Sequence, residues 1–135
     1  VQGNAVQEVA FTGHSLGGGL ASVAALVTDI PATTFNAAGI HKNTVQAYGI
    51  QLTDADDLID AYRVHWRLGP IPADPLSTLQ AGVHPLGFPI PGFFQLFTGN
   101  TGRTTVIRLP FLPTASSLVN PHGMGAVLEA GNWNH

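Results

Sequence analysis

The chain has 135 residues, of which 44% are hydrophobic and 10% are charged, and this composition predicts one folded domain with an apolar core. Its formal net charge is −3 and its five Lys and Arg residues are scattered, so no binding to nucleic acid is expected. The absence of Cys excludes disulfide bonds and thiolate chemistry.

The first third of the chain alternates between predicted strands and helices. Residues 6–12 (VQEVAFT) are expected to form a strand that is apolar on both faces, as in a buried parallel sheet. Residues 16–28 carry apolar side chains at helical spacing, with Gly and Ala between them, so this helix can lie close against a sheet. Pro31 ends that helix, and residues 32–39 (ATTFNAAG) have the composition of a second strand.

The same alternation continues, and every later element is predicted from its periodicity or its end signals. Thr53 and Asp56 resemble a capping box that opens a helix through Leu58. The other predicted elements are a helix over 42–48, a strand over 61–66, a strand over 104–110 and a helix over 123–130. Strands that alternate with helices predict an α/β fold, in which helices flank a parallel sheet.

A serine stands at the first strand-to-helix turn, in the pattern G-x-S-x-G formed by Gly13, His14, Ser15, Leu16 and Gly17. The glycines allow a sharp turn that exposes the serine hydroxyl, and the Leu16 N–H can face a developing oxyanion. The pattern therefore predicts that Ser15 is a nucleophile. The alternative is a turn of small residues that serves only to pack the helix on the strand.

Two phosphate-binding motifs fit this glycine-rich turn poorly. A P-loop would require Lys at the position of Gly19. A dinucleotide-binding fingerprint would require Gly at the position of Ser22, and no acidic residue follows at the expected distance.

A nucleophilic serine needs a histidine base, and doubly wound hydrolases place that histidine last in the order Ser, acid, His. His122, in NPHGMG, follows the fourth predicted strand and is the expected base, with a loop or capping role as the alternative. The other histidines fit less well because they stand in the turn, in a strand, in loops or at the end of the chain: His14, His41, His65, His84 and His135.

Asp74 is the expected acid of the triad because it follows the third predicted strand, in PADPLSTLQ. Its alternative role is a helix N-cap followed by Pro75. The remaining aspartates precede the second or third strand, at the opposite end of the sheet: Asp29, Asp54, Asp56, Asp57 and Asp60.

The chain resembles α/β-hydrolase lipases of the class 3 type, and most of all the bacterial phospholipase-like effector toxins with a G-H-S-L-G-G-G-L-A elbow. The resemblance rests on five segments that cover most of the chain: TGHSLGGGLAS (12–22), TFNAAGIHKNTV (34–45), LIDAYRVHW (58–66), DPLSTLQ (74–80) and HGMGAVLE (122–129). It implies hydrolysis of the carboxylic esters of acyl lipids, phospholipids in particular, by a serine hydrolase without a metal or other cofactor. It also implies secretion or delivery to a bacterial periplasm.

The Pro- and Gly-rich segment 82–97 has no regular pattern and is expected to form a loop that contacts lipid or a membrane surface, with completion of the core as an equal alternative. Its aromatic side chains are Phe88, Phe93, Phe94 and Phe97.

The resembled family has several strands before the elbow, whereas here the elbow strand stands near the first residue. We therefore expect the chain to be the C-terminal part of an α/β-hydrolase domain whose N-terminal remainder, or a second copy of the chain, pairs with the 6–12 strand. The second oxyanion donor would come from that remainder or that second copy.

The alternative function is a non-catalytic binding or assembly fragment of a hydrolase that needs a second polypeptide. The lengthened segment RLGPIPA (67–73) before Asp74 is the other departure from the family pattern.

Overall fold

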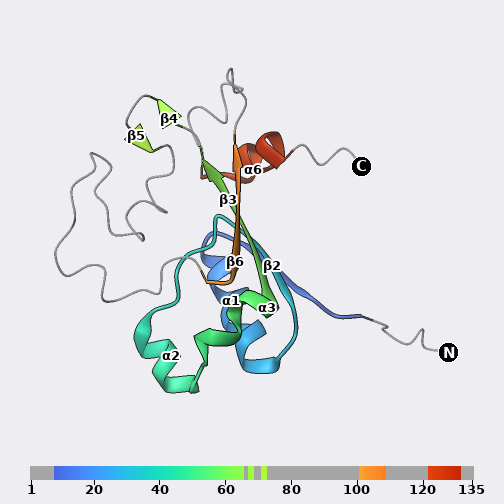
Figure 1. Cartoon of the computed structure of the whole chain (residues 1–135), viewed down its shortest axis with the longest axis vertical. Helices are drawn as coiled ribbons and strands as arrows, with labels where there is room; N and C mark the ends of the chain where they lie inside the picture. The colour runs from blue at the N-terminus through green and yellow to red at the C-terminus, as the bar shows by residue number, and fades with distance from the viewer. Residues whose placement is uncertain (1–7, 66, 69–70, 73–100, 109–121, 132–135) are drawn as a thin grey trace, which may run out of the picture.

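The computed structural model describes residues 8–65, 67–68, 71–72, 101–108 and 122–131. These residues contain a parallel sheet with the strand order β1-β2-β3-β6 and with helices against it, which confirms the predicted α/β class (Figure 1). The four strands are β1 (Phe11–His14), β2 (Ala32–Phe35), β3 (Ile59–His65) and β6 (Arg103–Arg108).

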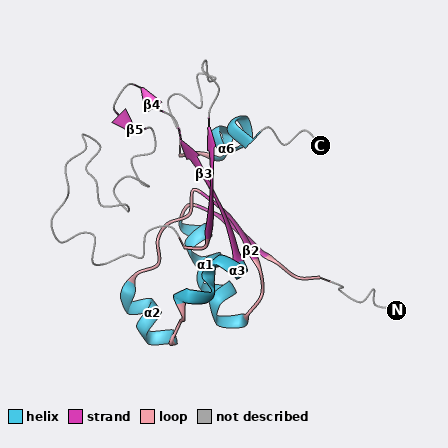
Figure 2. Ribbon diagram, in the orientation of Figure 1, coloured by secondary structure: helices cyan, strands magenta, loops and turns pink. Residues whose placement is uncertain are grey.

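Among the described residues, helices and a 3₁₀ turn connect or follow these strands (Figure 2). They are α1 (Leu16–Thr28), α2 (Lys42–Tyr48), the turn η1 (Leu52–Asp54), the one-turn helix α3 (Ala55–Leu58) and α6 (Met124–Gly131). The predicted bounds of the first two helices are confirmed. α2 begins where the Nδ1 atom of His41 accepts a hydrogen bond from the Asn43 N–H at 3.1 Å, and it ends at Gly49 with a φ of 62°.

The sheet is covered by two separate apolar clusters, because successive side chains of a strand point to opposite faces. The first cluster joins Ile59 and Ala61 of β3 to Ala25 of α1 and to Ala55 of α3. The second joins Val64 of β3 to Ala126 and Val127 of α6, with Phe35 and Ile107 packed against it. α1 and α6 therefore stabilise the sheet through different sets of side chains.

The first strand starts later than predicted. β1 begins at Phe11, and Val9 is exposed rather than buried. The cause lies in the neighbouring strand, since the Phe11 N–H donates to the Pro31 carbonyl at 2.8 Å and the β1–β2 register starts at Phe11 and Ala32. Pro31 has no N–H to donate, so the ladder does not extend to residues before Phe11.

The second strand ends earlier than predicted, at Phe35, because Asn36 adopts a φ of 43° that breaks the extended backbone.

The predicted capping box is also wrong. Thr53 donates its hydroxyl to the Asp54 carboxylate at 3.1 Å, and the side chain of the N-cap Asp54 caps no amide of α3. The segment expected to lengthen the approach to Asp74 contains a two-stranded antiparallel ribbon, β4 (Arg67–Leu68) and β5 (Ile71–Pro72).

β1 is an edge strand of the sheet that the described residues form. An exposed ion pair joins the amino ends of β3 and β6, where the Arg103 Nε atom donates to the Asp60 carboxylate at 3.0 Å. This carboxylate raises the pKa of Arg103 above its ordinary value.

Within the described ranges, none of the helices is both long and apolar enough to cross a membrane.

α1 lies unusually close to β1 and to the segment after β2, because its inward face is made of small residues. The buried positions of this face are Gly18, Gly19, Ala21, Ser22 and Ala25. A Cβ atom on Gly13 would lie 2.2 Å from the Gly17 carbonyl oxygen, and one on Gly18 would lie 2.7 Å from the Ala37 Cβ atom. The close turn from β1 into α1 therefore requires glycine at these two positions.

This packing predicts opposite effects for two neighbouring glycines. Gly13→Ala should lower the free energy of unfolding by about 3 kcal/mol, the upper part of the range for overpacking, because the atoms it meets are backbone. Gly17→Ala should leave stability unchanged or raise it by up to about 1 kcal/mol, because its Cβ meets nothing within 4 Å and alanine favours a helix. Urea denaturation measures both, and equal losses would contradict the described turn.

Candidate active site

Ser15 stands between β1 and α1 in a strained backbone conformation, with φ 55° and ψ −124°. A non-glycine residue in such a region costs on the order of 1–3 kcal/mol and persists only where its surroundings hold it. Here the Ser15 N–H donates to the Phe35 carbonyl at 3.1 Å, and the Ser15 carbonyl accepts from the Ala38 N–H at 2.8 Å and the Gly19 N–H at 3.1 Å. These bonds fasten the turn to the end of β2.

His122 lies next to Ser15 although 107 positions separate them in the sequence. Its Nε2 atom is 2.8 Å from the Ser15 Oγ atom, within hydrogen-bonding distance. His122 comes from the turn just before α6, and both side chains are half-buried. The structure thus brings together two of the three residues that the sequence predicts for a triad.

The backbone of His122 is held by two side chains that point to the same carbonyl oxygen. The His14 Nε2–H donates to it at 2.7 Å, and the Asn36 Nδ2–H donates to it at 3.0 Å. The rings of His14 and His122 also pack, with their centroids 5.1 Å apart. His14 therefore contacts the backbone of the candidate base, while Ser15, its neighbour, meets the ring of that base.

Asn36 links three segments through one side chain that is 2% exposed. Its Oδ1 atom accepts from the Val64 N–H of β3 at 2.8 Å, while its Nδ2–H donates to His122. Its own backbone N–H donates to the Tyr62 carbonyl at 2.8 Å. The φ of 43° aims the side chain at these partners, and asparagine tolerates this region better than most residues.

Sequence reasoning did not predict the contacts of His14 and Asn36 with His122. The sequence places His14 only in the G-x-S-x-G turn, whereas in the structure its ring donates to the His122 carbonyl. A signal for Asn36 was available, since an asparagine directly after a buried strand, inside the segment TFNAAG, is typical of a residue at positive φ.

Leu16 is the first residue of α1, and the first amides of a helix have no acceptor within it. Their N–H groups and the positive end of the helix dipole favour a negative charge nearby. The Leu16 amide, next to Ser15 in the chain, is thus in a suitable place to receive an oxyanion that forms on a group bound to the Ser15 hydroxyl.

Some of the predicted site residues cannot be compared with the structure. Asp74 and the four phenylalanines of segment 82–97 lie outside the described residues. Asp60, one of the acids set aside, belongs to the amino end of β3 and binds Arg103. In the part of the chain that the structure describes, no three His, Asp or Glu side chains gather in a way that could hold a metal ion.

Residues 2–102 match the family described as Phospholipase-like, the Tle-like phospholipase domain. The chain belongs to this family. The match confirms the resemblance to phospholipase-like proteins and assigns the chain, at family level, to the lipid-ester hydrolases. A 40-residue segment is 58% identical to the extracellular phospholipase A1 of Serratia liquefaciens. That segment is 30% of this chain and 12% of the Serratia protein.

The contacts of Asn36 generate a prediction about stability. Asn36→Gly should lower the free energy of unfolding by about 1–3 kcal/mol, because the buried Val64 N–H loses its acceptor and the His122 carbonyl loses a donor. Asn36→Ala should lower it by about 1–2 kcal/mol more, because alanine is strained at positive φ and glycine is not.

The glycine variant at position 36 is thus expected to be more stable than the alanine variant. This reverses the usual order, in which alanine is the better replacement. Asn43→Ala, on the exposed surface of α2, is the matched control and should change stability by less than about 0.5 kcal/mol. Denaturant unfolding monitored by circular dichroism separates the three variants. An alanine variant as stable as the glycine variant would mean that Asn36 does not keep its positive φ.

Proposed function

We propose that this chain carries the nucleophile and the general base of a serine hydrolase that cleaves the carboxylic esters of acyl lipids. The observation that carries the proposal is the 2.8 Å separation between the Ser15 Oγ atom and the His122 Nε2 atom at a strained strand-to-helix turn. A hydroxyl becomes a strong nucleophile when a positioned imidazole accepts its proton, and a distance of this size permits that transfer. Membership of a phospholipase-like family supports a lipid ester as the substrate.

The proposed reaction proceeds through an acyl-enzyme. Ser15 Oγ attacks the ester carbonyl carbon while its proton passes to His122 Nε2, and the carbonyl oxygen becomes an oxyanion near the Leu16 N–H. The tetrahedral intermediate then expels the alcohol portion of the lipid, which takes the proton from His122. A water molecule activated by His122 releases the fatty acid and restores Ser15. The chemistry uses no cofactor.

Positioning of His122 matters for both proton transfers. A ring that tips by about 1 Å loses much of the benefit of a preorganised base. The bonds from His14 and Asn36 to the His122 carbonyl restrict the backbone from which the ring projects. We assign these two side chains the role of positioning residues.

Two further parts complete the proposed site. Asp74 orients the His122 ring by accepting from its Nδ1–H, as the acid of such a triad does. The second oxyanion donor comes from another stretch of polypeptide that lies beside β1, either a preceding part of the same hydrolase or a second copy of the chain. The edge position of β1 and the exposed Val9 before it support a neighbour at this place.

We propose a phospholipid as the substrate within the class of acyl esters, and hence an activity of the phospholipase A type. The matched segment of the Serratia relative is the support for this narrower assignment.

The first test concerns the nucleophile. A fluorophosphonate probe should label Ser15 in the natural polypeptide that carries this sequence, and Ser15→Ala should abolish labelling. Turnover of a phospholipid or an ester should fall on the order of 10³-fold or more, because members of a triad act as a unit. Mass spectrometry of the labelled peptide identifies the modified residue.

Ser22→Ala is the matched control on the same helix. Ser22 is buried, donates its hydroxyl to the Gly18 carbonyl at 3.0 Å, and has no proposed role in the chemistry. This variant should keep both labelling and turnover. Labelling that survives in Ser15→Ala would overturn the proposal.

The second test concerns the acid. Asp74→Asn should lower turnover on the order of 10³- to 10⁴-fold while the unfolding temperature is unchanged, because the ring of His122 loses the carboxylate that orients it and stabilises its charged form. Asp56→Asn, at an exposed position of α3, should leave turnover within about twofold of wild type. Wild-type turnover by Asp74→Asn would show that another group orients His122.

A further inference from the structure

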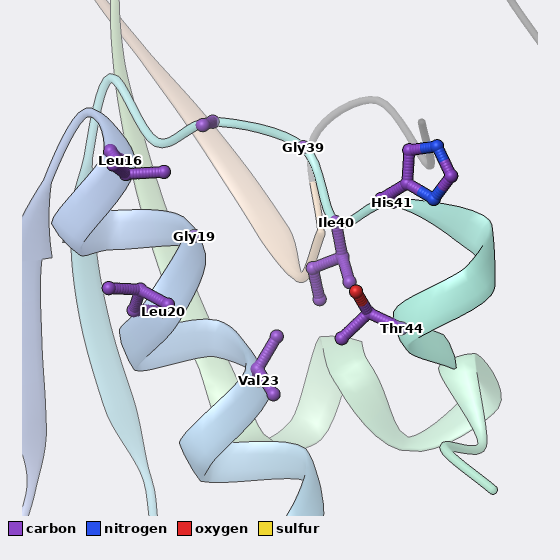
Figure 3. Close-up of a pocket in the computed structure, with 9 residues that line it drawn as sticks. Leu16, Gly19, Leu20, Val23, Gly39, Ile40, His41 and Thr44 are labelled. Carbon is purple, nitrogen blue, oxygen red and sulfur yellow. The ribbon is translucent and has the colours of Figure 1, made fainter. Parts of the chain in front are cut away.

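An apolar groove starts at the N-terminal end of α1 and continues along the outside of that helix (Figure 3). We call it the α1 groove, and its volume is about 200 Å³. One wall is formed by α1, with Leu16, Leu20 and Val23, and the other by the segment after β2 and the start of α2, with Ala38, Ile40 and Thr44.

Both walls of the α1 groove are attached to the turn that holds Ser15. Leu16 follows Ser15 directly in the chain, and its side chain lines the start of the groove. On the opposite wall, the Ala38 N–H donates to the Ser15 carbonyl at 2.8 Å. An ester carbonyl bound between the Ser15 hydroxyl and the Leu16 N–H would therefore lie next to the start of this groove.

The groove has an exposed apolar wall that a water-facing helix rarely presents. α1 contains no charged residue, and Leu16 and Leu20 are 71% and 64% exposed. A surface helix ordinarily carries polar or charged side chains on its outer face, and an exposed apolar patch of this kind marks a binding surface. Among the described residues that line the groove there is no Asp, Glu, Lys or Arg.

We propose that the α1 groove binds the acyl chain of the ester substrate, an inference that rests on the proposed function. From Leu16 to Val23 the groove covers two turns of helix, a length of about 10 Å. In Figure 3, Val23 of α1 faces Ile40 and Thr44 of the opposite wall, so these side chains set the width at this depth. The groove thus selects esters by how far their saturated acyl chains extend past Leu16 toward Val23.

The groove can be narrowed without touching the proposed chemistry. Val23→Phe places a larger side chain opposite Ile40 and Thr44. Val27→Phe, one turn further along α1 at an exposed position that does not line the groove, is the matched control. Thr44→Leu narrows the same place from the other wall and from a different helix.

The measurement is kcat/KM for p-nitrophenyl acetate, butyrate, octanoate and dodecanoate, with the natural polypeptide that carries this sequence. In wild type, kcat/KM should rise with chain length by up to roughly fourfold per methylene group until the groove is filled, as expected for burial of CH₂. Val23→Phe and Thr44→Leu should lower the octanoate-to-acetate ratio of kcat/KM about tenfold or more. That loss equals the burial of roughly two methylene groups. Val27→Phe should keep the wild-type ratio.

Failure of this inference is distinct from failure of the proposed function. Active Val23→Phe and Thr44→Leu enzymes with an unchanged octanoate-to-acetate ratio would overturn the acyl-chain assignment, and the groove would then be covered by polypeptide or by a membrane surface. If Val23→Phe loses activity on all four esters equally, the octanoate-to-acetate ratio of Thr44→Leu decides. An unchanged ratio in that variant would also overturn the acyl-chain assignment. A wild-type polypeptide that hydrolyses none of the four esters and takes up no fluorophosphonate would overturn the proposed function itself.

Discussion

The candidate site depends on one buried side-chain amide. Asn36 accepts a hydrogen bond from β3 and donates one to the His122 carbonyl, so a single group joins the centre of the sheet to the segment that carries His122, the proposed base. Buried amides are costly unless each polar atom is paired, and here the oxygen and the nitrogen both have a partner. Removing the amide would leave polar backbone groups of two segments unpaired at the same time.

Ser15, the proposed nucleophile, is held in a comparable way, by backbone rather than by side chains. The strained Ser15 is bonded through its own N–H and carbonyl to Phe35 and Ala38, which stand on either side of Asn36 in the chain. The short segment after β2 therefore contacts the turn of Ser15 and the backbone of His122 together. The glycines of the elbow allow α1 to come near enough for these bonds to form.

Local signals in the sequence were sufficient for much of the fold and for the Ser–His pair. α1 has clear periodicity and is followed by Pro31, α2 is bounded by Gly49, and the order of strands places His122 at the same end of the sheet as Ser15. The ends of β1 and β2 could not be predicted, because they depend on the ladder that begins at Pro31 and on the positive φ of Asn36. The roles of His14 and Asn36 could not be predicted either, since their contacts with His122 join positions 108 and 86 residues apart.

The two apolar clusters have a consequence for how such a site can be switched off. Ser15 leads into α1, which packs in the first cluster, whereas His122 leads into α6, which packs in the second through Ala126 and Val127. An eight-residue helix is too short to persist in water by itself, so α6 stays formed only while that second cluster holds. Local opening of α6 would withdraw His122 and leave the turn of Ser15 and its half of the sheet intact. Without an imidazole to accept its proton, the Ser15 hydroxyl would be a weak nucleophile, in a molecule that is still largely folded.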